Sequence, residues 1–251
     1  MIQTCKVIAT YIGPRPVRVK KARQRRGIRL QDLGTADKVL DLLTNVWDLE
    51  ARIDPGLPMD TYLICNGGYP EEHAGFFYEI DGAKTPGGIM RVIQRENTGL
   101  SFGAYAHAFD KLRDRYEYWL FSEDDVVQTR SGYLPVYREA LGVDSVGFVA
   151  TVGVANYHGD KHVHGGCGFA DREILNQVAK QYGGFLPYAK IEPTFERGRR
   201  SGKPIFNHGP FCKQGEVPLT NSIYRMGHGF KLITAYTEAY YEWRQREISS
   251  G

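Results

Sequence analysis

Short runs of strand-forming residues alternate with helical patterns in the first half of the chain. Strand-like runs occupy residues 5–12, 61–65, 76–80, 90–94 and 116–121. Apolar side chains recur at helical spacing over residues 35–50, with Thr35 as the expected N-cap, and over residues 100–113. Alternation of this kind is typical of an α/β sheet with helices on its faces.

Beyond Tyr133 the pattern is less regular. It predicts a strand at 146–154, a His- and Gly-rich loop at 156–168, a helix at 171–181 and a Gly-, Pro- and Arg-rich loop at 183–214. Long loops tend to carry binding and catalytic residues on a rigid scaffold. We therefore expect the second half of the chain to build much of the site.

The composition limits the class of protein. A chain of 251 residues with 42% apolar residues can bury the core of one domain. The formal net charge of +3 gives no general affinity for polyanions. No apolar run approaches the roughly 20 residues that span a bilayer, and the four cysteines form no C-x-x-C pair. These features lead us to expect a cytoplasmic protein with reduced thiols and no transmembrane segment.

Residues 18–29 (RVKKARQRRGIR) carry seven basic side chains and no acidic one. Such a run is either a solvated loop or an arm that folds over a diphosphate or attracts an anionic acceptor. It lacks the interleaved aromatic residues of a single-strand groove, which disfavours nucleic acid as a partner.

Three acids follow a strongly apolar run in residues 118–127 (YWLFSEDDVV). Ligands of open α/β sheets bind at the carboxyl ends of the strands, so Glu123, Asp124 and Asp125 would project into such a crevice. Their mutual repulsion favours a bound cation, and a hard divalent ion such as Mg²⁺ or Mn²⁺ shares its oxygen ligands with phosphates. A solvated turn at the strand end is the alternative.

The preceding segment, residues 95–104 (RENTGLSFGA), strengthens the case for a ligand. Glycines at 99 and 103 allow close approach of the backbone, and a helix N-terminus favours an anion. The order of N-x-G, helix, apolar strand and acid cluster is much more specific than any one of these elements.

Residues 95–127 resemble the donor half of family 2-like glycosyltransferases of the GT-A fold, within the nucleotide-diphospho-sugar transferase superfamily. The resemblance implies a Rossmann-like α/β fold, with a mixed, mainly parallel twisted sheet flanked by helices. It implies one domain over residues 1–251, with a donor half at 1–130 and an acceptor half at 131–251. It also implies a divalent ion, Mn²⁺ or Mg²⁺, held by Glu123 and Asp125, although glutamate replaces the usual first aspartate.

A second match lies at residues 215–231 (GEVPLTNSIYRMGHGFK), which resemble the segment that supplies the family's catalytic base. The resemblance implies that Glu216 is this base. Val217 stands where the family has an aspartate, so either Glu216 takes the role or the base is lost. An ordinary surface helix is the alternative, and Asp171 or Glu173 are the next candidates for a base.

Weaker matches complete the resemblance. The residues that it places against the nucleotide-sugar are Tyr11, Ile12, Gly13, Asn66, Arg95, Asn97, Gly99, Gly103, Glu123 and Asp124. Asn66 stands where an aspartate often reads uracil, which favours a UDP-type donor, because an amide can both donate and accept. Gly165 and Gly166 resemble the glycine-rich floor beneath the sugar and the acceptor.

The histidines allow several interpretations. His158, His162 and His164 have a spacing that suits zinc, but a loop of solvated or hydrogen-bonding histidines is the favoured interpretation. GT-A enzymes often draw a further metal ligand from a C-terminal histidine. We favour His208, in a predicted loop, over His228, which follows a predicted helix.

Taken together, these matches predict a glycosyltransferase that moves a sugar from a nucleoside-diphosphate donor to a carbohydrate or other hydroxyl acceptor, with inversion if Glu216 is the base. A sugar-phosphate nucleotidyltransferase is one alternative, although residues 13–16 (GPRP) make a poor phosphate loop. A non-catalytic nucleotide- or glycan-binding module is the other, and Val217 and Glu123 support it.

Overall fold

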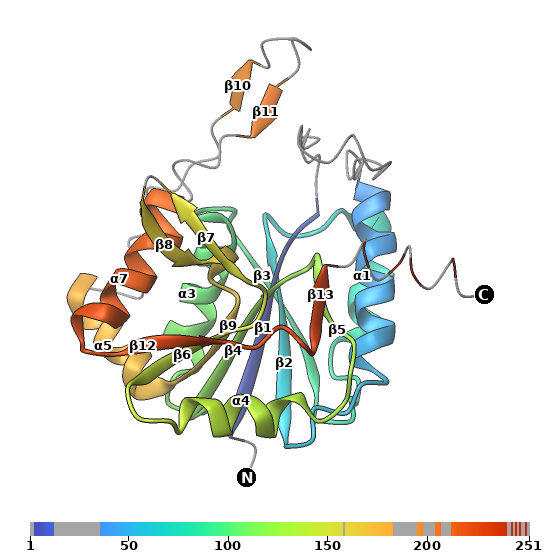
Figure 1. The fold of residues 1–251 in the computed structure, drawn as a ribbon. Coiled ribbons are helices and arrows are strands. Elements are labelled where there is room, and N and C mark those ends of the chain that lie inside the picture. Colours follow the sequence, from blue (N-terminus) through green and yellow to red (C-terminus); the bar gives the residue numbers. More distant parts are fainter. Residues whose placement is uncertain are drawn as a thin grey trace.

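The computed structural model describes residues 3–12, 36–157, 159–182, 195–197, 204–206 and 212–239, and four single residues after 239. A seven-stranded sheet forms the centre, in the order β12-β6-β9-β4-β1-β2-β3 (Figure 1). Its strands are β1 (Thr4–Tyr11), β2 (Met59–Asn66), β3 (Met90–Arg95), β4 (Tyr118–Glu123), β6 (Val146–Ala150), β9 (Gly168–Asp171) and β12 (Gly229–Leu232). Among these strands β9 alone runs antiparallel to both of its neighbours, and the other pairings are parallel.

Helices cover both faces of this sheet. They are α1 (Ala36–Glu50), α2 (Ala74–Ile80), α3 (Leu100–Leu112), α4 (Tyr133–Leu141), α5 (Arg172–Tyr182) and α7 (Val217–Arg225). α3, α5 and α7 pack on one face in a common apolar cluster, and α1, α2 and α4 pack on the other. The predicted α/β fold, with a mixed and mainly parallel sheet between helices, is therefore confirmed.

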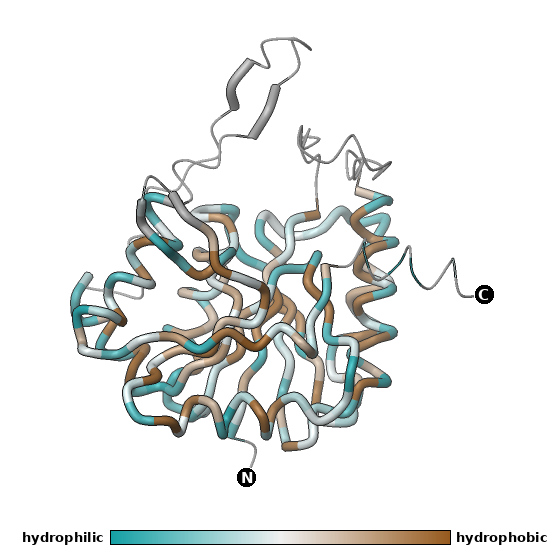
Figure 2. The backbone as a smooth tube through the Cα atoms, in the orientation of Figure 1, coloured by the Kyte–Doolittle hydropathy of each residue, from teal (hydrophilic) through white to brown (hydrophobic). Residues whose placement is uncertain are grey.

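β1 shows how the sequence produces this arrangement. Successive side chains of a strand point to opposite faces, so Val7 packs in the α3 cluster and Ile8 packs against α1. Because both faces are covered, the first seven residues of β1 are buried. Figure 2 shows hydrophobic segments concentrated in the strands at the centre of the molecule.

Two sequence-based expectations about secondary structure are wrong. Residues 76–80 belong to helix α2, whose buried side chains Phe77 and Ile80 stand three apart while Tyr78 is 74% exposed. The predicted loop at 156–168 contains an antiparallel hairpin of β7 (Val154–Tyr157) and β8 (Asp160–Val163), followed by the 3-10 turn η3 (His164–Gly166). The remaining long elements that the pattern predicts are present.

Smaller elements lie around the sheet. β5 (Val126–Gln128) pairs antiparallel with β13 (Thr237–Ala239), and β10 (Phe195–Arg197) pairs with β11 (Pro204–Phe206). A 3-10 turn, η2 (Glu71–His73), precedes α2, and a π-helix, η5 (Cys212–Glu216), precedes α7. Most of the predicted loop at 183–214 lies outside the described residues.

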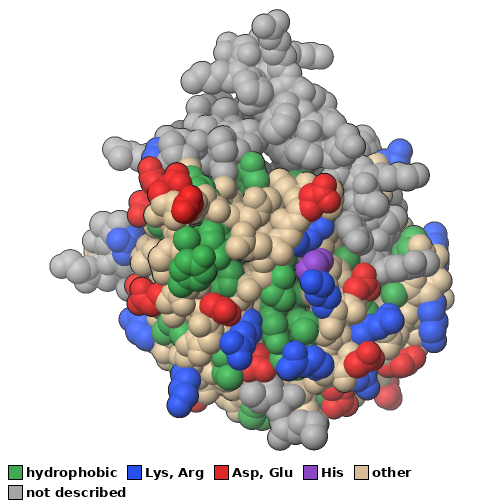
Figure 3. All heavy atoms as spheres, turned by 180° about the vertical axis from the view of Figure 1, so that it is seen from behind, with side chains coloured by type: hydrophobic (Ala, Val, Ile, Leu, Met, Phe, Trp, Pro, Cys, Tyr) green, Lys and Arg blue, Asp and Glu red, His purple; other side chains and the backbone are tan. Residues whose placement is uncertain are grey.

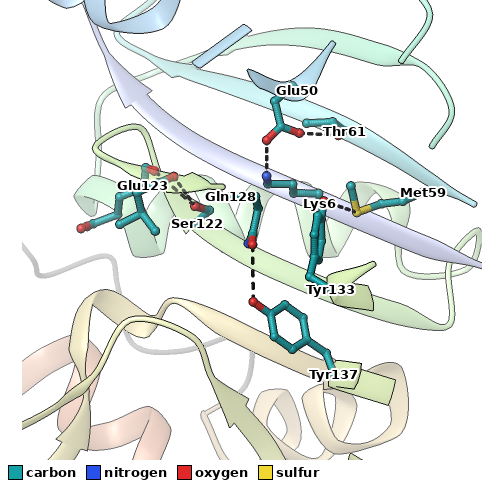
Figure 4. Close-up of polar contacts among 10 residues, drawn as sticks. Lys6, Glu50, Met59, Thr61, Ser122, Glu123, Gln128, Tyr133 and Tyr137 are labelled. Carbon is teal, nitrogen blue, oxygen red and sulfur yellow. Dashed lines mark hydrogen bonds and ion pairs between the residues drawn. The ribbon is translucent and has the colours of Figure 1, made fainter. Parts of the chain in front are cut away.

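A buried ion pair lies between the sheet and α1. Lys6, in the middle of β1, donates to Glu50 at the end of α1, and the two side chains are 1% and 7% exposed. Thr61 donates to the second oxygen of Glu50 at 3.4 Å. Figure 4 shows Lys6 and Glu50 pointing toward each other, with Tyr133 against Met59 nearby. The partners compensate for removing two charges from water.

Acidic and basic side chains are interspersed on the face seen in Figure 3, with no large field of one sign. In the described part of the chain, no helix has both the length and the apolar character needed to cross a bilayer.

Candidate active site

The acidic turn after β4 lies at the carboxyl end of the strand, and its first acid faces α3. Glu123 accepts a hydrogen bond from Ser101 Oγ at 2.6 Å, on the first turn of that helix. β4 and α3 thus meet at this carboxylate, which is half-buried. The predicted placement of the acid cluster at the carboxyl edge of the sheet agrees with this geometry.

Asp124 points the opposite way. Its side chain accepts a hydrogen bond from Thr10 of β1, its backbone N–H donates to the Ala9 carbonyl at 3.2 Å, and it is 3% exposed. Asp125 is half-buried in the turn that leads to β5. The turn after β4 thus gives Asp124 and Glu123 different neighbours, and a contact of Asp124 with the donor stays a prediction.

Arg95 and Asn66 hold the loop between β3 and α3. The Arg95 guanidinium donates to the Asn66 side-chain oxygen, and also to Thr98 Oγ1 at 2.8 Å. Asn66 donates in turn to the Leu100 carbonyl at 3.2 Å, and it is 3% exposed. The structure therefore gives both side chains a role in shaping the loop, and their contact with a nucleotide stays a prediction.

Gly99, at the end of this loop, and Gly103, in the first turn of α3, both have a role in the backbone. Gly99 precedes α3 with a φ of 74°, a left-handed conformation that favours glycine. A Cβ atom on Gly103 would stand 1.9 Å from the Thr98 carbonyl oxygen. Gly103 thus allows a close approach of its own chain, and a contact of Gly99 or Gly103 with a nucleotide-sugar stays a prediction.

Tyr11 and Asn97 come together over Gly67, at the ends of β1 and β2. A Cβ atom on Gly67 would stand 3.4 Å from the Tyr11 ring and 3.4 Å from the Asn97 Cβ. Ile12 is 6% exposed and packs with α1, so its side chain belongs to the core. Gly13 lies outside the described residues, as do the basic run at 18–29 and His158.

Gly165 lies between two carboxylates that come from distant parts of the chain. Its backbone N–H donates to Oε1 of Glu216. On its Cα side, a Cβ atom would stand 3.1 Å from Oε2 of Glu123. Gly165 has a φ of 63°, in the left-handed region. The predicted metal ligand Glu123, the predicted base Glu216 and the predicted floor residue Gly165 thus form one cluster.

Phe102 packs this cluster from the α3 side. Cβ atoms built on Gly166 and Gly215 would approach its ring to 2.7 and 2.4 Å. The ring is fully buried. Absence of side chains at both glycines allows η3 and η5 to close on the same aromatic ring.

Glu216 is the last residue of η5 and is 3% exposed. Its Oε2 lies 3.2 Å from Nε2 of His162, a buried residue of β8. π-Helical turns are rare and frequent at functional sites. Sequence reasoning missed this role of His162, because it treated residues 156–168 as a loop. Two short β-prone runs around His158-Gly159 were the available signal of a hairpin.

Tyr105 and Cys167 lie beneath Gly165. Tyr105 Oη donates to the Gly165 carbonyl at 3.5 Å. Burial raises the pKa of both side chains above their ordinary values, and the Glu123 carboxylate contributes in the same direction. Both groups are therefore neutral at physiological pH and add no charge to the cluster.

The described residues contain no group of three or more His, Cys, Asp or Glu side chains arranged to hold a metal ion. His208 lies outside the described residues. His228 lies beyond the C-terminal end of α7, against Gly147 at the start of β6. It is therefore at the opposite end of α7 from Glu216. A metal site at Glu123 and Asp125 stays a prediction.

Asp171 and Glu173 lie away from the acid cluster. Asp171 pairs with Tyr118, the first residue of β4, whereas Glu123 is the last. Its carboxylate accepts the Ile174 N–H at 2.7 Å, at the start of α5. The geometry thus favours Glu216 over these two residues as the acid nearest to Glu123.

A separate surface cavity of about 520 Å³ is lined by Val154, Ala155, Lys161, Tyr224 and Phe230. It lies between the β7–β8 hairpin and the C-terminal end of α7. None of the predicted site residues lines it.

Comparisons with known protein families and with curated proteins give no match. Among solved structures, one similar chain is a proposed nucleotide-diphospho-sugar transferase from Desulfovibrio desulfuricans G20, at 13% identity and a TM-score of 0.47, over 93% of this chain and 80% of the other. A second is 4-diphosphocytidyl-2C-methyl-D-erythritol synthase from Anaerococcus prevotii DSM 20548. It has 8% identity and a TM-score of 0.46, over 98% of this chain and 96% of the other. A third is a nucleoside-diphosphate-sugar pyrophosphorylase from Vibrio cholerae RC9. It has 11% identity and a TM-score of 0.44, over 96% of this chain and 98% of the other. Similarity at this level carries no conclusion about the reaction or the substrate of this chain.

Proposed function

We propose that this protein is a glycosyltransferase that moves a sugar from a nucleoside-diphosphate donor to a hydroxyl acceptor. The observation that carries the proposal is the meeting of Glu123 and Glu216 at Gly165. One carboxylate ends a sheet strand and the other opens a helix, at the edge of the sheet where α/β proteins bind ligands. Two acids with separate surroundings suit a reaction that needs both a charge-binding group and a base.

The donor half of the site contains Glu123 and Asp125, with the β3–α3 loop beside them. Their carboxylates are the hard oxygen ligands that Mg²⁺ and Mn²⁺ prefer, and two protein ligands leave positions for diphosphate oxygens and water. Such an ion, when bound, offsets the charge that develops on the departing nucleoside diphosphate. Tyr11 and Asn97 stand at the same edge and are proposed to contact the nucleoside, for which we favour a UDP-type donor.

Glu216 is proposed to act as the general base. It would accept the proton of the acceptor hydroxyl while that oxygen attacks the anomeric carbon and the bond to the diphosphate breaks. Direct displacement of this kind inverts the configuration at the anomeric carbon. Gly165 supports the assignment because its N–H fixes one oxygen of Glu216 next to Glu123. Carbohydrates or other hydroxyl compounds are the proposed acceptors.

A binding and hydrolysis screen tests the proposal. Thermal shifts are measured with nucleoside diphosphates and nucleotide-sugars, with Mn²⁺ and with a chelator. Slow hydrolysis of one nucleotide-sugar is then followed by release of the nucleoside diphosphate. We expect stabilisation that depends on both nucleotide and Mn²⁺, and hydrolysis that depends on Glu216.

The same screen separates the two alternatives. Release of pyrophosphate from a nucleoside triphosphate and a sugar phosphate would identify a nucleotidyltransferase. Binding of nucleotide or glycan without turnover of any donor would identify a non-catalytic module. Equal stabilisation in Mn²⁺ and in chelator would contradict the metal site.

A further inference from the structure

Glu216 is fixed by a single segment of the chain, the end of the β7–β8 hairpin with the turn that follows it. Gly165 N–H donates to Oε1, and His162 Nε2 lies 3.2 Å from Oε2. Both side chains of the His162–Glu216 pair are almost fully buried, at 2% and 4% exposure. A carboxylate removed from water needs such partners, because an unpartnered buried charge is costly.

Two further hydrogen bonds fasten the hairpin to the start of α7. Val163 N–H donates to Thr220 Oγ1 at 3.1 Å, and Thr220 Oγ1 donates to the Glu216 carbonyl at 2.9 Å. Thr220 is fully buried. The backbone of Glu216 is therefore fixed by the same hairpin that holds its carboxylate.

Gly165 and His162 play different parts in this contact. The Gly165 N–H belongs to the backbone, and it restrains one oxygen whatever side chains surround it. The second oxygen depends on a side chain that carries a donor at the right distance. Without such a donor, the Gly165 hydrogen bond alone restrains the carboxylate, and one contact at Oε1 does not fix the position of Oε2.

We infer that His162 is a positioning residue, which donates from Nε2 to Oε2 and holds the Glu216 carboxylate in the orientation that its proposed role requires. The inference rests on the proposed function for its catalytic consequence and on the 3.2 Å contact for its physical basis. Catalytic groups must be held within about 0.5 Å of a productive geometry by neighbours of this kind.

Two substitutions separate a positioning role from simple packing. His162→Leu introduces an apolar side chain of similar size and removes the donor, whereas His162→Gln keeps an N–H that can reach the carboxylate. We expect His162→Leu to lower kcat for nucleotide-sugar turnover by roughly tenfold, which is less than the roughly 100-fold or greater loss that removal of a general base causes, because Glu216 itself remains. The KM for the donor should stay the same, and His162→Gln should restore most of the rate.

The matched control is His164→Gln, at an exposed histidine two positions along the same segment. It should turn over at the wild-type rate. If His162→Leu folds normally and also turns over at the wild-type rate, the inference is overturned. Equal impairment of the Leu and Gln variants would overturn it as well, because that result indicates packing.

A double-mutant cycle in urea gives a readout that does not need turnover. Glu216→Gln and His162→Leu each remove one side of the contact, so the double variant should lower the unfolding midpoint by less than the sum of the two single shifts. Additive shifts would overturn the inference. If the shifts are coupled but the protein turns over no donor, the His162–Glu216 contact is supported and the proposed glycosyl transfer is contradicted. Failure of the inference and failure of the proposed function therefore give different results.

Discussion

Gly165 places its Cα against the Glu123 carboxylate, with Oε2 3.1 Å from the position that a Cβ atom would take. Gly165→Ala should therefore push this carboxylate away as well as strain the backbone at φ 63°. A Cβ atom there requires the carboxylate to move by a few tenths of an ångström. We therefore expect turnover to fall, but by less than the roughly 100-fold that a displacement of about 1 Å in a catalytic group can cost. Turnover of a nucleotide-sugar measures the catalytic loss, and urea denaturation of the same variant measures the loss of stability.

Gly132→Ala is the matched control for that variant. Gly132 has a φ of 76° with no atom within 4 Å of its Cβ position. It should show the same backbone cost, roughly 1 to 2 kcal/mol of unfolding free energy, and normal turnover. Equal loss of turnover in both variants would contradict a specific role for Gly165.

Asp125→Asn should abolish the Mn²⁺-dependent part of nucleoside-diphosphate binding, because an amide is a weaker ligand than a carboxylate for a hard divalent ion. Calorimetric titration with and without Mn²⁺ measures the effect. Asp144→Asn, on an exposed turn before β6, serves as the control and should bind as the wild type does. Unchanged Mn²⁺ dependence in Asp125→Asn would remove Asp125 from the proposed metal site.

Glu216→Gln keeps the size of the side chain and one acceptor oxygen for Gly165, while it removes the basic group. We expect turnover to fall by roughly 100-fold or more, the usual scale for losing a general base, with little change in nucleotide affinity. Steady-state kinetics and calorimetry measure the two quantities separately. Near-normal turnover would mean that Glu216 is not the base.

Breaking the buried Lys6–Glu50 pair should be far more costly than breaking an exposed pair. Glu50→Gln leaves the Lys6 ammonium in the core, and we expect the free energy of unfolding to fall by about 3 to 5 kcal/mol. The double variant Lys6→Met with Glu50→Leu removes both charges, so its free energy of unfolding should fall by less than that of Glu50→Gln. Urea denaturation gives both values.

The His73–Asp37 pair, in which His73 is only 11% exposed but Asp37 faces solvent, provides the comparison. The two side chains are 3.2 Å apart, and Asp37 is 81% exposed. Asp37→Asn should cost less than about 1 kcal/mol. A Glu50→Gln variant that is as stable as Asp37→Asn would show that the buried pair is not needed for stability.

Burial raises the pKa of Cys5, Cys65 and Cys167 above that of an ordinary thiol. A raised pKa means less thiolate at a given pH, so alkylation by iodoacetamide at about pH 8.5, where a free cysteine is half ionised, should be slow in the native protein. It should become faster as the pH rises. Peptide mapping by mass spectrometry reads each cysteine separately, and urea-unfolded protein gives full labelling. Rapid native labelling of any of the three would contradict its burial.

The long elements of this fold are predictable because each has a local cause. α1 and α3 carry their apolar side chains at helical spacing, β1 contains the apolar run Val7–Ala9, and β4 begins with the apolar run Tyr118–Phe121. The pattern mistakes α2 for a strand, because a helix of only seven residues shows no more than about two turns, and its aromatic side chains also suit a strand.

The contacts of the candidate site are less predictable. The sequence indicates Glu123, Gly165 and Glu216 through motifs, but no local pattern predicts that all three meet. His162 escapes sequence reasoning because its partner Glu216 lies in another element, and the β-prone runs of the hairpin do not indicate that contact. The Lys6–Glu50 pair is equally unpredictable, because the partner that allows a charged residue in a central strand lies at the end of α1.

The antiparallel strand β9 has a consequence for synthesis. It pairs with β4 on one side and with β6 on the other, although it follows both in the chain. Until the ribosome has synthesised β9, β4 and β6 lack the strand that lies between them. Pairings between distant segments form slowly, because the chain between them must first be ordered. Nascent chains that end before β9 therefore expose strand edges, the type of surface that chaperones protect and that drives aggregation.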